Sequence, residues 1–436
     1  MACIAKEVET ELLPFFRVYK DGYVERLLGS QYVPPLLDDP ETGVSSKDIT
    51  ISQDPLIKAR VFLPKLDEPH QKLPVLVYYH GGGFCVESAF SSDHHRYLDG
   101  LVSQAKVVAV SVEYRMAPEH YLPAAYEDGW AALQWIASHF AENVIDDEPW
   151  LTNHGNSERF FLGGDSAGAN IAHNIAMKVG KEGLPGGLKV LGVSLTHPYF
   201  CGSKEIGSET CEDPEDFGCL VWNFVYPSAP GGVDCPMINP VAPDAPSLAG
   251  LACSRLFVSV SENDELRHRG IAYYEAVKES GWEGEAELVE VEGEDHAFHI
   301  LKFETPKAKD LTRKVADFLT KYHNLRQPQY LCSPLPPPKP SSKPNPKTCH
   351  LGLLPCRPHT KFSSPDNLMV NPAGEVAPSL AGLACSWLLV KERGRKGEVK
   401  LFEVEGEGHC YKILCETETE IENVKKMNKC LASFLV

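Results

Sequence analysis

The sequence predicts an α/β fold with a mainly parallel central sheet and helices on both faces, and three observations support this prediction. From Leu73 onward, short apolar segments alternate with segments whose apolar residues recur every three or four positions, which is typical of strands followed by helices. Two glycine-rich motifs directly follow two of the apolar segments, where a strand-to-helix turn is expected. Hydrophobic residues make up 43% of the 436 residues, enough to bury a sizeable core.

The strands are expected at short runs of β-branched and aromatic residues that are bounded by glycine, proline or charged residues. These runs span residues 74–79, 107–113, 159–162, 190–195, 255–259 and 287–291. Helices are expected over residues 124–140, 167–179, 266–278 and 307–322, because apolar residues fall on one face of each segment. Successive units of strand and helix build a parallel sheet, since each helix returns the chain to the same end of the sheet.

The composition changes after residue 323, so the first domain is predicted to span residues 1–323. Seven prolines lie between positions 334 and 346; they rule out a helix or a central strand, and residues 324–364 are therefore predicted to form an extended linker. Residues 365–436 repeat residues 239–323 in part: residues 377–386 repeat 245–254, and residues 403–409 repeat 290–296 with one substitution. A strand over residues 399–404 would be the counterpart of 287–291. The copy lacks the stretch that corresponds to Asp264, so we expect it to be catalytically incomplete.

The charge balance excludes several classes of partner. With 42 basic and 60 acidic residues, the net charge is −18, which would repel nucleic acid and anionic membrane surfaces. The N-terminal residues lack the apolar stretch of a secretory signal, and no apolar run is long enough to span a bilayer. We expect a cytoplasmic protein, with a nuclear location left open.

The cysteines indicate neither a disulfide framework nor a metal site. In a reducing compartment the 14 cysteines are expected to be free thiols. One group of potential metal ligands lies in the proline-rich stretch with irregular spacing, and we expect no metal there. That group consists of Cys349, His350, Cys356 and His359. No cofactor is expected either.

The first motif with chemical meaning is a glycine-flanked serine. Residues 164–168 match G-x-S-x-G, in which a serine sits on a tight turn between a strand and a helix with its hydroxyl exposed to a general base. The predicted strand at 159–162 and the predicted helix at 167–179 give the motif that context. The residues are Gly164, Asp165, Ser166, Ala167 and Gly168, and Ser166 is the expected nucleophile.

The second motif is a run of glycines after the predicted strand at 74–79. It consists of His80, Gly81, Gly82 and Gly83 and matches the H-G-G-G loop that completes an oxyanion hole. Acyl transfer builds negative charge on a carbonyl oxygen, which backbone N–H groups stabilise by about 3 kcal/mol each. The expected donors are the amides of Gly82, Gly83 and Ala167.

A serine nucleophile needs an imidazole base, and a carboxylate must hold that imidazole in one tautomer. His296 is the expected base and Asp264 the expected carboxylate, because each follows one of the last two predicted strands. The order Ser, Asp, His along the chain fits this arrangement. The alternatives are His299 and His323 for the base, and Glu262 and Asp295 for the carboxylate.

These motifs resemble those of the plant carboxylesterases, which belong to the hormone-sensitive-lipase-like branch of the α/β hydrolases. The resemblance spans residues 7 to about 322 and includes the segments at 16–22, 80–83, 113–119, 164–170, 197–200 and 293–296. It implies an α/β-hydrolase fold, the triad and oxyanion hole named above, and a helical cap formed by about residues 1–45 and 200–245. Four aromatic residues of the N-terminal segment, together with the region after Tyr199, are implied to cover an apolar acyl pocket, with ordinary core packing as the alternative for these residues: Phe15, Phe16, Tyr19 and Tyr23.

The predicted function is hydrolysis of small-molecule carboxylic esters through an acyl-enzyme on Ser166, with His296 as base and Asp264 as its orienting acid. One alternative is a binding protein similar to the gibberellin receptors, which share this fold. Those receptors have replaced the catalytic histidine, whereas His296 is present here. The other alternative is elimination of the 2-hydroxyisoflavanone dehydratase type, from which the spacing of the motifs does not separate an esterase.

Overall fold

The computed structural model describes residues 7–141, 148–207, 217–321, 389–393, 400–406 and 409–415. They fall into two units, one containing the described residues up to 321 and the other the three strands between 389 and 415. Each unit is described by itself. The group around Cys349 at which no metal is expected, the predicted linker and His323 lie outside the described residues.

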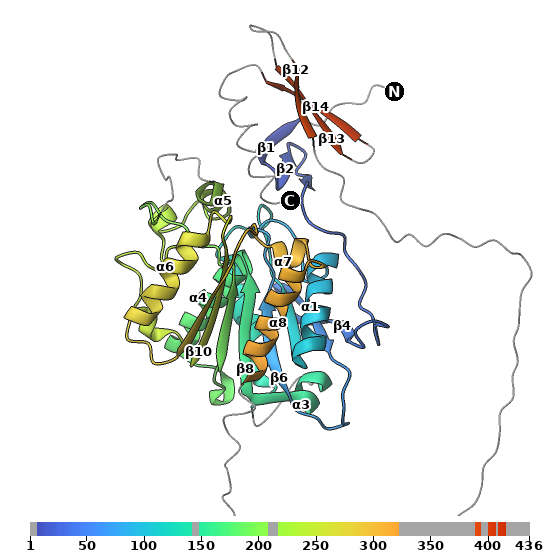
Figure 1. Cartoon of the computed structure of the whole chain (residues 1–436), viewed down its shortest axis with the longest axis vertical. Coiled ribbons are helices and arrows are strands. Elements are labelled where there is room, and N and C mark those ends of the chain that lie inside the picture. The colour runs from blue at the N-terminus through green and yellow to red at the C-terminus, as the bar shows by residue number, and fades with distance from the viewer. Residues whose placement is uncertain are drawn as a thin grey trace, which may run out of the picture. The chain divides into compact units, whose positions relative to one another are not determined.

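An eight-stranded sheet forms the centre of the first unit (Figure 1). Its strands lie in the order β11, β10, β9, β8, β6, β7, β5, β4, and all neighbours are parallel except on the two sides of β5. In chain order the strands are β4 (Ser45–Gln53), β5 (Leu56–Leu63), β6 (Leu73–Tyr79), β7 (Val108–Glu113), β8 (Gly155–Asp165), β9 (Gly192–Thr196), β10 (Arg255–Ser261) and β11 (Glu285–Val291).

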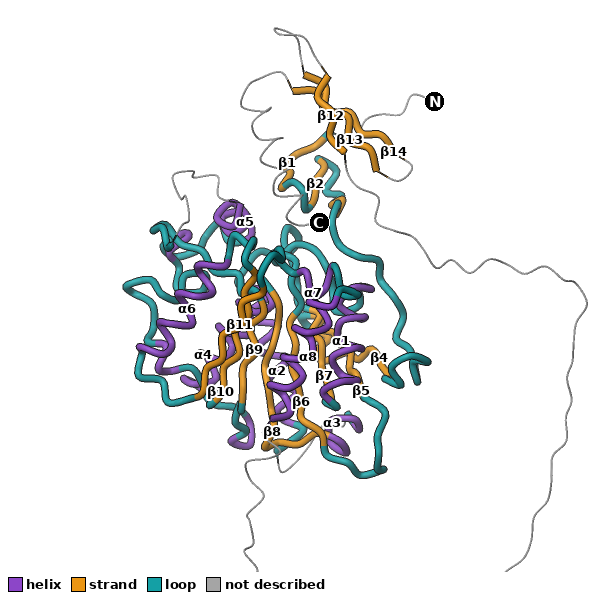
Figure 2. The backbone as a smooth tube through the Cα atoms, viewed as in Figure 1, coloured by secondary structure: helices purple, strands orange, loops and turns teal. Residues whose placement is uncertain are grey.

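Helices cover both faces of this sheet (Figure 2). The helices are α1 (Ser92–Ala105), α2 (Ala124–Ser138), α3 (Pro149–His154), α4 (Ala167–Glu182), α5 (Phe217–Val225), α6 (Arg267–Glu279), α7 (Phe298–Leu301) and α8 (Pro306–Thr320). Helices α1 and α8 pack together over one apolar cluster, whereas α2, α4 and α6 share the larger cluster on the other face. β6, β7 and β9 are entirely buried except for Glu113, as strands covered on both faces must be.

The direction in which successive strands are added to the sheet reverses between β6 and β8. The chain passes from β6 through α1 to β7 on one side, and then crosses back to β8 on the other side of β6. In an open parallel sheet such a reversal leaves a crevice outside the carboxyl ends of the two strands. The two glycine motifs follow β6 and β8, so the fold itself places them next to each other at this crevice.

The predicted α/β elements are present, with shifts of a few residues at their ends. The largest difference is β8, which begins at Gly155, four residues before the predicted start. Helix α1 and the antiparallel pair of β4 and β5 were not predicted from the sequence. Both are needed for the sheet: β5 extends it beyond β7, and α1 supplies the crossover between β6 and β7.

The N-terminal segment forms a small antiparallel sheet of its own. Its strands are β1 (Val8–Leu12), β2 (Phe16–Tyr19) and β3 (Val24–Arg26). Arg26 links it to the main body: its guanidinium donates to the backbone oxygen of Cys85, 2.8 Å away, and pairs with Glu119. The segment that was expected to form half of a helical cap is therefore mainly strand and loop up to residue 45.

The second unit is an antiparallel sheet of β12 (Leu389–Arg393), β13 (Lys400–Gly406) and β14 (His409–Cys415). β13 contains the residues that repeat the end of β11, yet β11 pairs in parallel with β10. Between its two repeated segments the copy is 19 residues shorter than the original, too short to hold a counterpart of the whole of α6, the helix that precedes β11, and consecutive strands pair antiparallel instead. The boundaries of the linker and of the repeat remain predictions.

The described residues contain no helix long and apolar enough for a bilayer crossing. Within the same residues there is also no group of three or more potential metal-binding side chains. The cysteines among the described residues up to 321 are Cys85, Cys201, Cys219, Cys235 and Cys253, and all five are free thiols.

Candidate active site

Ser166 occupies a strained turn between β8 and α4. Its φ of 50° and ψ of −118° lie outside the regions that a serine ordinarily adopts. The flanking glycines make this turn sterically possible, because a Cβ atom on Gly168 would lie 1.9 Å from the backbone oxygen of Tyr79 and one on Gly164 would lie 2.6 Å from it. The G-x-S-x-G spacing therefore lets the turn approach the end of β6, and it leaves Ser166 on the wall of a pocket.

The glycine loop lies on the same pocket. Gly82 and Gly83 line it and both have positive φ values, 100° and 60°. Ala167 is fully buried at the first position of α4, where backbone N–H groups have no partner inside the helix and favour negative charge. Two of the three expected oxyanion donors thus lie in the glycine loop on the pocket, and the third directly follows Ser166 at the start of α4.

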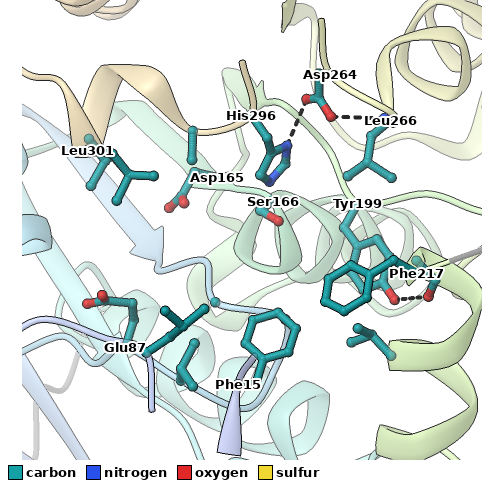
Figure 3. Close-up of a pocket in the computed structure, with 18 of the residues that line it drawn as sticks. Phe15, Glu87, Asp165, Ser166, Tyr199, Phe217, Asp264, Leu266, His296 and Leu301 are labelled. Atoms are coloured by element: carbon teal, nitrogen blue, oxygen red, sulfur yellow. Dashed lines mark hydrogen bonds and ion pairs between the residues drawn. The ribbon is translucent and has the colours of Figure 1, made fainter. Parts of the chain in front are cut away.

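His296 and Asp264 are joined by a hydrogen bond. The distance from Nδ1 of His296 to Oδ2 of Asp264 is 2.7 Å, and both side chains are almost fully buried. Figure 3 shows the imidazole pointing toward Ser166 with Asp264 behind it. Burial would lower the pKa of His296, but the charge of Asp264 and the hydrogen bond outweigh it and raise that pKa. For Asp264, burial would raise the pKa, but His296 outweighs it and lowers it.

The other candidates for the base and the carboxylate make different contacts. Asp295 accepts from Lys302 at 3.1 Å, and Glu262 accepts from the backbone N–H of Gly293 at 2.7 Å. His299 is buried on α7 against the ring of Tyr97, and it does not line the pocket. The geometry thus favours His296 and Asp264 over their rivals.

His80 supports the glycine loop from behind. It is fully buried, its ring stacks on Tyr114 at 4.2 Å, and its Nδ1 lies 2.8 Å from the backbone oxygen of Gly81. Burial lowers the pKa of His80 to about 4, so the ring is neutral and donates from Nδ1. The hydroxyl of Tyr114 donates to the backbone oxygen of His80 at 2.6 Å. His80 therefore shapes the loop and does not line the pocket.

The remaining walls of the pocket are largely apolar. Aromatic residues lie across Ser166 from His296 (Figure 3): Phe15 and Phe217 stack with ring centroids 5.4 Å apart, and Tyr199 lies next to them on the same wall. The aliphatic lining residues are Leu28, Val86, Val221, Leu266, Ile300 and Leu301. The charged and polar lining residues outside the expected triad are Glu87, His94, Asp165, Asn263 and Glu265.

Only part of the implied aromatic cap lines this pocket. Phe15 does, together with Leu28 and Gly29 from the N-terminal segment. Phe16 is buried instead against Phe224 of α5. The two tyrosines of that set stack on each other away from the pocket, and Tyr23 is 53% exposed. The expectation that all four aromatic residues cover the pocket is wrong for the last three.

Comparison with known proteins agrees with the geometry. A family model described as the α/β hydrolase fold matches residues 76–300, which include both glycine motifs, Asp264 and His296. The chain belongs to this family of α/β hydrolases. Its relatives and structural neighbours confirm the expected fold and the resemblance to plant carboxylesterases.

Two plant relatives of this α/β hydrolase carry different names. A 2-hydroxyisoflavanone dehydratase of Glycyrrhiza echinata is 58% identical over 318 residues, which cover 72% of this chain and 97% of that protein. "Probable carboxylesterase 2" of Arabidopsis thaliana is 42% identical over 320 residues, or 73% of this chain and 98% of that protein. Among solved structures, an esterase of Pyrobaculum calidifontis is 27% identical with a TM-score of 0.53, covering 64% of this chain and 85% of the esterase.

Proposed function

We propose that the chain is a serine carboxylesterase that hydrolyses small-molecule esters through an acyl-enzyme on Ser166. The observation that supports this most directly is the convergence of Ser166, the hydrogen-bonded pair of His296 and Asp264, and the glycine loop on one pocket. In this proposal Ser166, Asp264 and His296 are the catalytic residues, and the amides of Gly82, Gly83 and Ala167 form the oxyanion hole.

In the first half-reaction, Oγ of Ser166 attacks the ester carbonyl while Nε2 of His296 takes the hydroxyl proton. The Nδ1–H of His296 donates to Asp264, which fixes the tautomer that leaves Nε2 as the acceptor and stabilises the imidazolium that forms. The carbonyl oxygen gains a negative charge, which the amides of the glycine loop stabilise. The imidazolium then protonates the departing alcohol, and the acyl group remains on Ser166.

In the second half-reaction, water replaces the alcohol. His296 takes a proton from the water as it attacks the acyl carbon, and the same amides hold the oxygen that becomes negative. Collapse of this intermediate breaks the bond to Ser166 and returns the proton to Oγ. The products are a carboxylic acid and the free enzyme, so the cycle consumes one ester and one water.

The aromatic wall indicates the kind of ester. Phe15 and Phe217 come from the N-terminal segment and from α5, and together they present apolar surface opposite His296. Such a wall favours an aromatic or otherwise apolar group on one side of the reacting carbonyl.

Replacing Phe217 by Ala is expected to raise KM for an aryl-acyl ester by about 5-fold, because the lost aromatic contact is worth about 1 kcal/mol. The KM for an acetyl ester should change by less than 2-fold. The matched control is Phe224→Ala, a residue of the same helix that packs against Phe16 and Tyr121 and does not line the pocket. Steady-state kinetics on the ester pair measure this. Equal effects of the two substitutions on the aryl ester would contradict the assignment of the wall.

A second candidate function is dehydration of a 2-hydroxyisoflavanone, which the 58% identity to the Glycyrrhiza dehydratase favours. The same pocket residues suit this chemistry. His296 would take the proton from the carbon next to the carbonyl, the glycine loop would hold the enolate oxygen, and the neighbouring hydroxyl would leave with a proton as water. No acyl group would form on Ser166.

One comparison on the purified chain separates the two candidates. We expect kcat/KM for a short aryl-acyl ester to exceed that for a 2-hydroxyisoflavanone by at least 100-fold, with an acyl group on Ser166 detectable by mass spectrometry after rapid quenching. Release of alcohol measures the first reaction and formation of isoflavone measures the second. Isoflavone formation with the higher kcat/KM, and no acyl-enzyme, would replace the esterase proposal by the dehydratase.

A further inference from the structure

Three charged side chains outside the proposed triad meet beside the glycine loop. Glu87 follows the loop, His94 lies in the first turn of α1, and Asp165 ends β8 directly before Ser166. All three touch the pocket, and the side chains of His94 and Asp165 are each 3% exposed. The sequence analysis identified only Asp165, as a member of the G-x-S-x-G motif.

His94 lies between the two carboxylates. Its Nε2 is 3.2 Å from Oδ1 of Asp165, and its Nδ1 is 3.3 Å from Oε2 of Glu87. A ring with a carboxylate at each nitrogen donates from both nitrogens, which only the imidazolium form can do. The backbone N–H of Gly81 lies 3.3 Å from Nε2 and 3.0 Å from Oδ1 of Asp165. Because Nε2 carries a proton, this amide donates to Asp165.

Each carboxylate ties His94 to a different part of the pocket. Asp165 accepts from the amide of Gly81 and, at 2.6 Å, from the hydroxyl of Tyr78. The packing there is close, since a Cβ on Gly81 would lie 2.2 Å from Oδ2 of Asp165. Glu87 accepts from the backbone N–H of Ser30 at 2.8 Å and from its hydroxyl at 3.1 Å. Ser30 follows Gly29 of the N-terminal segment, which lines the pocket.

We propose, on the basis of the esterase function above, that His94 is a positioning residue of the oxyanion hole. Its imidazolium holds the carboxylate of Asp165 against the amide of Gly81, which fixes the loop that presents the amides of Gly82 and Gly83. Through Glu87 it also joins this loop to the N-terminal segment that closes the pocket. His94 does not touch the reacting atoms and acts only through these contacts.

The charges around His94 agree with a permanent imidazolium. Burial would lower the pKa of His94, but Asp165 and Glu87 outweigh it and raise this pKa to about 10. Three buried rings also face it: burial raises the pKa of Tyr78 and lowers the pKa values of His80 and His299 to about 4. They are therefore neutral at pH 7 and leave His94 as the only cation of this group. Without the positive charge of His94, two buried carboxylates would lie close together with no counter-charge between them, which is unfavourable.

The proposal predicts a loss in kcat with little change in KM. Replacing His94 by Gln is expected to lower kcat for an aryl-acyl ester about 10-fold, because small displacements of oxyanion donors weaken transition-state stabilisation more than substrate binding. KM should stay within about 2-fold. An aryl trifluoromethyl ketone, whose hemiketal adduct with Ser166 carries an oxyanion, should bind about 10-fold more weakly to the variant.

Two further variants make this test decisive. The double variant E87Q/H94Q keeps the net charge of the buried group at that of the wild type and should show the same 10-fold loss, so a folding defect of H94Q alone does not block the measurement. His95→Gln is the matched control: the next residue of α1 contacts Arg60 and Phe62, away from Asp165, and kcat and ketone affinity should stay within 2-fold.

Two negative outcomes have different meanings. Wild-type protein that neither turns over esters nor forms the ketone adduct would overturn the esterase function itself. An active wild type with unchanged kcat and ketone affinity in folded H94Q or in the double variant would overturn only the role of His94. An equal loss of kcat in the His95 variant would also overturn the role of His94, since any change in α1 would then have the same effect.

Discussion

Replacing Ser166 by Ala is expected to lower kcat/KM for ester hydrolysis by about 10⁴-fold or more, because no other group can form the acyl-enzyme. Binding of the ester should change little, since the pocket walls are intact. The packing of the tight turn should also stay unchanged, because alanine keeps the Cβ atom of the serine. Ser166 is only 9% exposed there. Initial rates with an aryl-acyl ester, corrected for the uncatalysed reaction, measure the loss.

The matched control for this substitution is Ser261→Ala. Ser261 is also buried close to the proposed triad, where its hydroxyl lies 2.9 Å from Nε2 of His197, but it does not line the pocket. Its loss should lower kcat/KM by less than 10-fold. Ester turnover by Ser166→Ala at more than a hundredth of the wild-type rate would mean that the nucleophile is another group.

Replacing Asp264 by Asn is expected to lower kcat by about 10⁴-fold, because an amide that donates toward Nδ1 places the imidazole proton on Nε2, where the base must accept one. The pH profile should change as well. Esterase activity requires neutral His296, so the wild-type rate rises with pH through the raised pKa of that ring. Without Asp264, the two largest contributions that raise the pKa of His296 are gone, so this pKa falls and the rising limb of the remaining activity moves to lower pH.

The control for Asp264 is the neighbouring carboxylate of Asp295. It precedes His296 in the chain but pairs with Lys302, so Asp295→Asn should retain activity within a few-fold and keep the wild-type pH profile. Rates measured from pH 5 to 9 at saturating ester distinguish the two variants. A limb that stays in place in Asp264→Asn, or one that moves in Asp295→Asn, would show that Asp264 does not orient the base.

The sequence predicted the central sheet well where the chain alternates between apolar strands and amphipathic helices. Four of its strands are continuous runs of largely apolar residues that a solvent-exposed segment would not have: β6, β7, β9 and β10. It did not predict α1, whose first turn holds Asp93, His94 and His95 and looks polar. The later turns of α1 bury apolar residues such as Leu98 and Leu101, and Glu87 and Asp165 supply partners for the buried His94 of the first turn.

The motifs predicted Ser166, the glycine loop and the loops of Asp264 and His296, because each follows the carboxyl end of a strand. The sequence favoured Asp264 but left Glu262 and Asp295 open, since all three carboxylates lie within a few residues of such an end. The hydrogen bond to His296 favours Asp264. His94 had no comparable signal. It meets Asp165 across 71 positions of the chain, and only the fold, which brings the first turn of α1 to the end of β8, places the two side chains together.

The C-terminal strands show the limit of reasoning from a repeated sequence. Residues 403–406 repeat residues 290–293, but β13 lies in an antiparallel sheet while β11 is an edge strand of a parallel one. Residues 290–291 and 403–404 are in a strand in both places, whereas 292–293 form a turn after β11 and 405–406 continue β13. Which partner they pair with depends on the preceding helix, for the whole of which the copy is too short.

The most direct test of the central claim is covalent labelling of the intact chain with a serine-directed organophosphate, followed by mass spectrometry of the whole protein and its peptides. An activated hydroxyl at Ser166 predicts one adduct per chain, on the peptide that contains Ser166, with loss of ester turnover in proportion to labelling. The Ser166→Ala variant should remain unlabelled. No adduct on the wild type, or an adduct on a different residue, would contradict the assignment of Ser166 as the nucleophile.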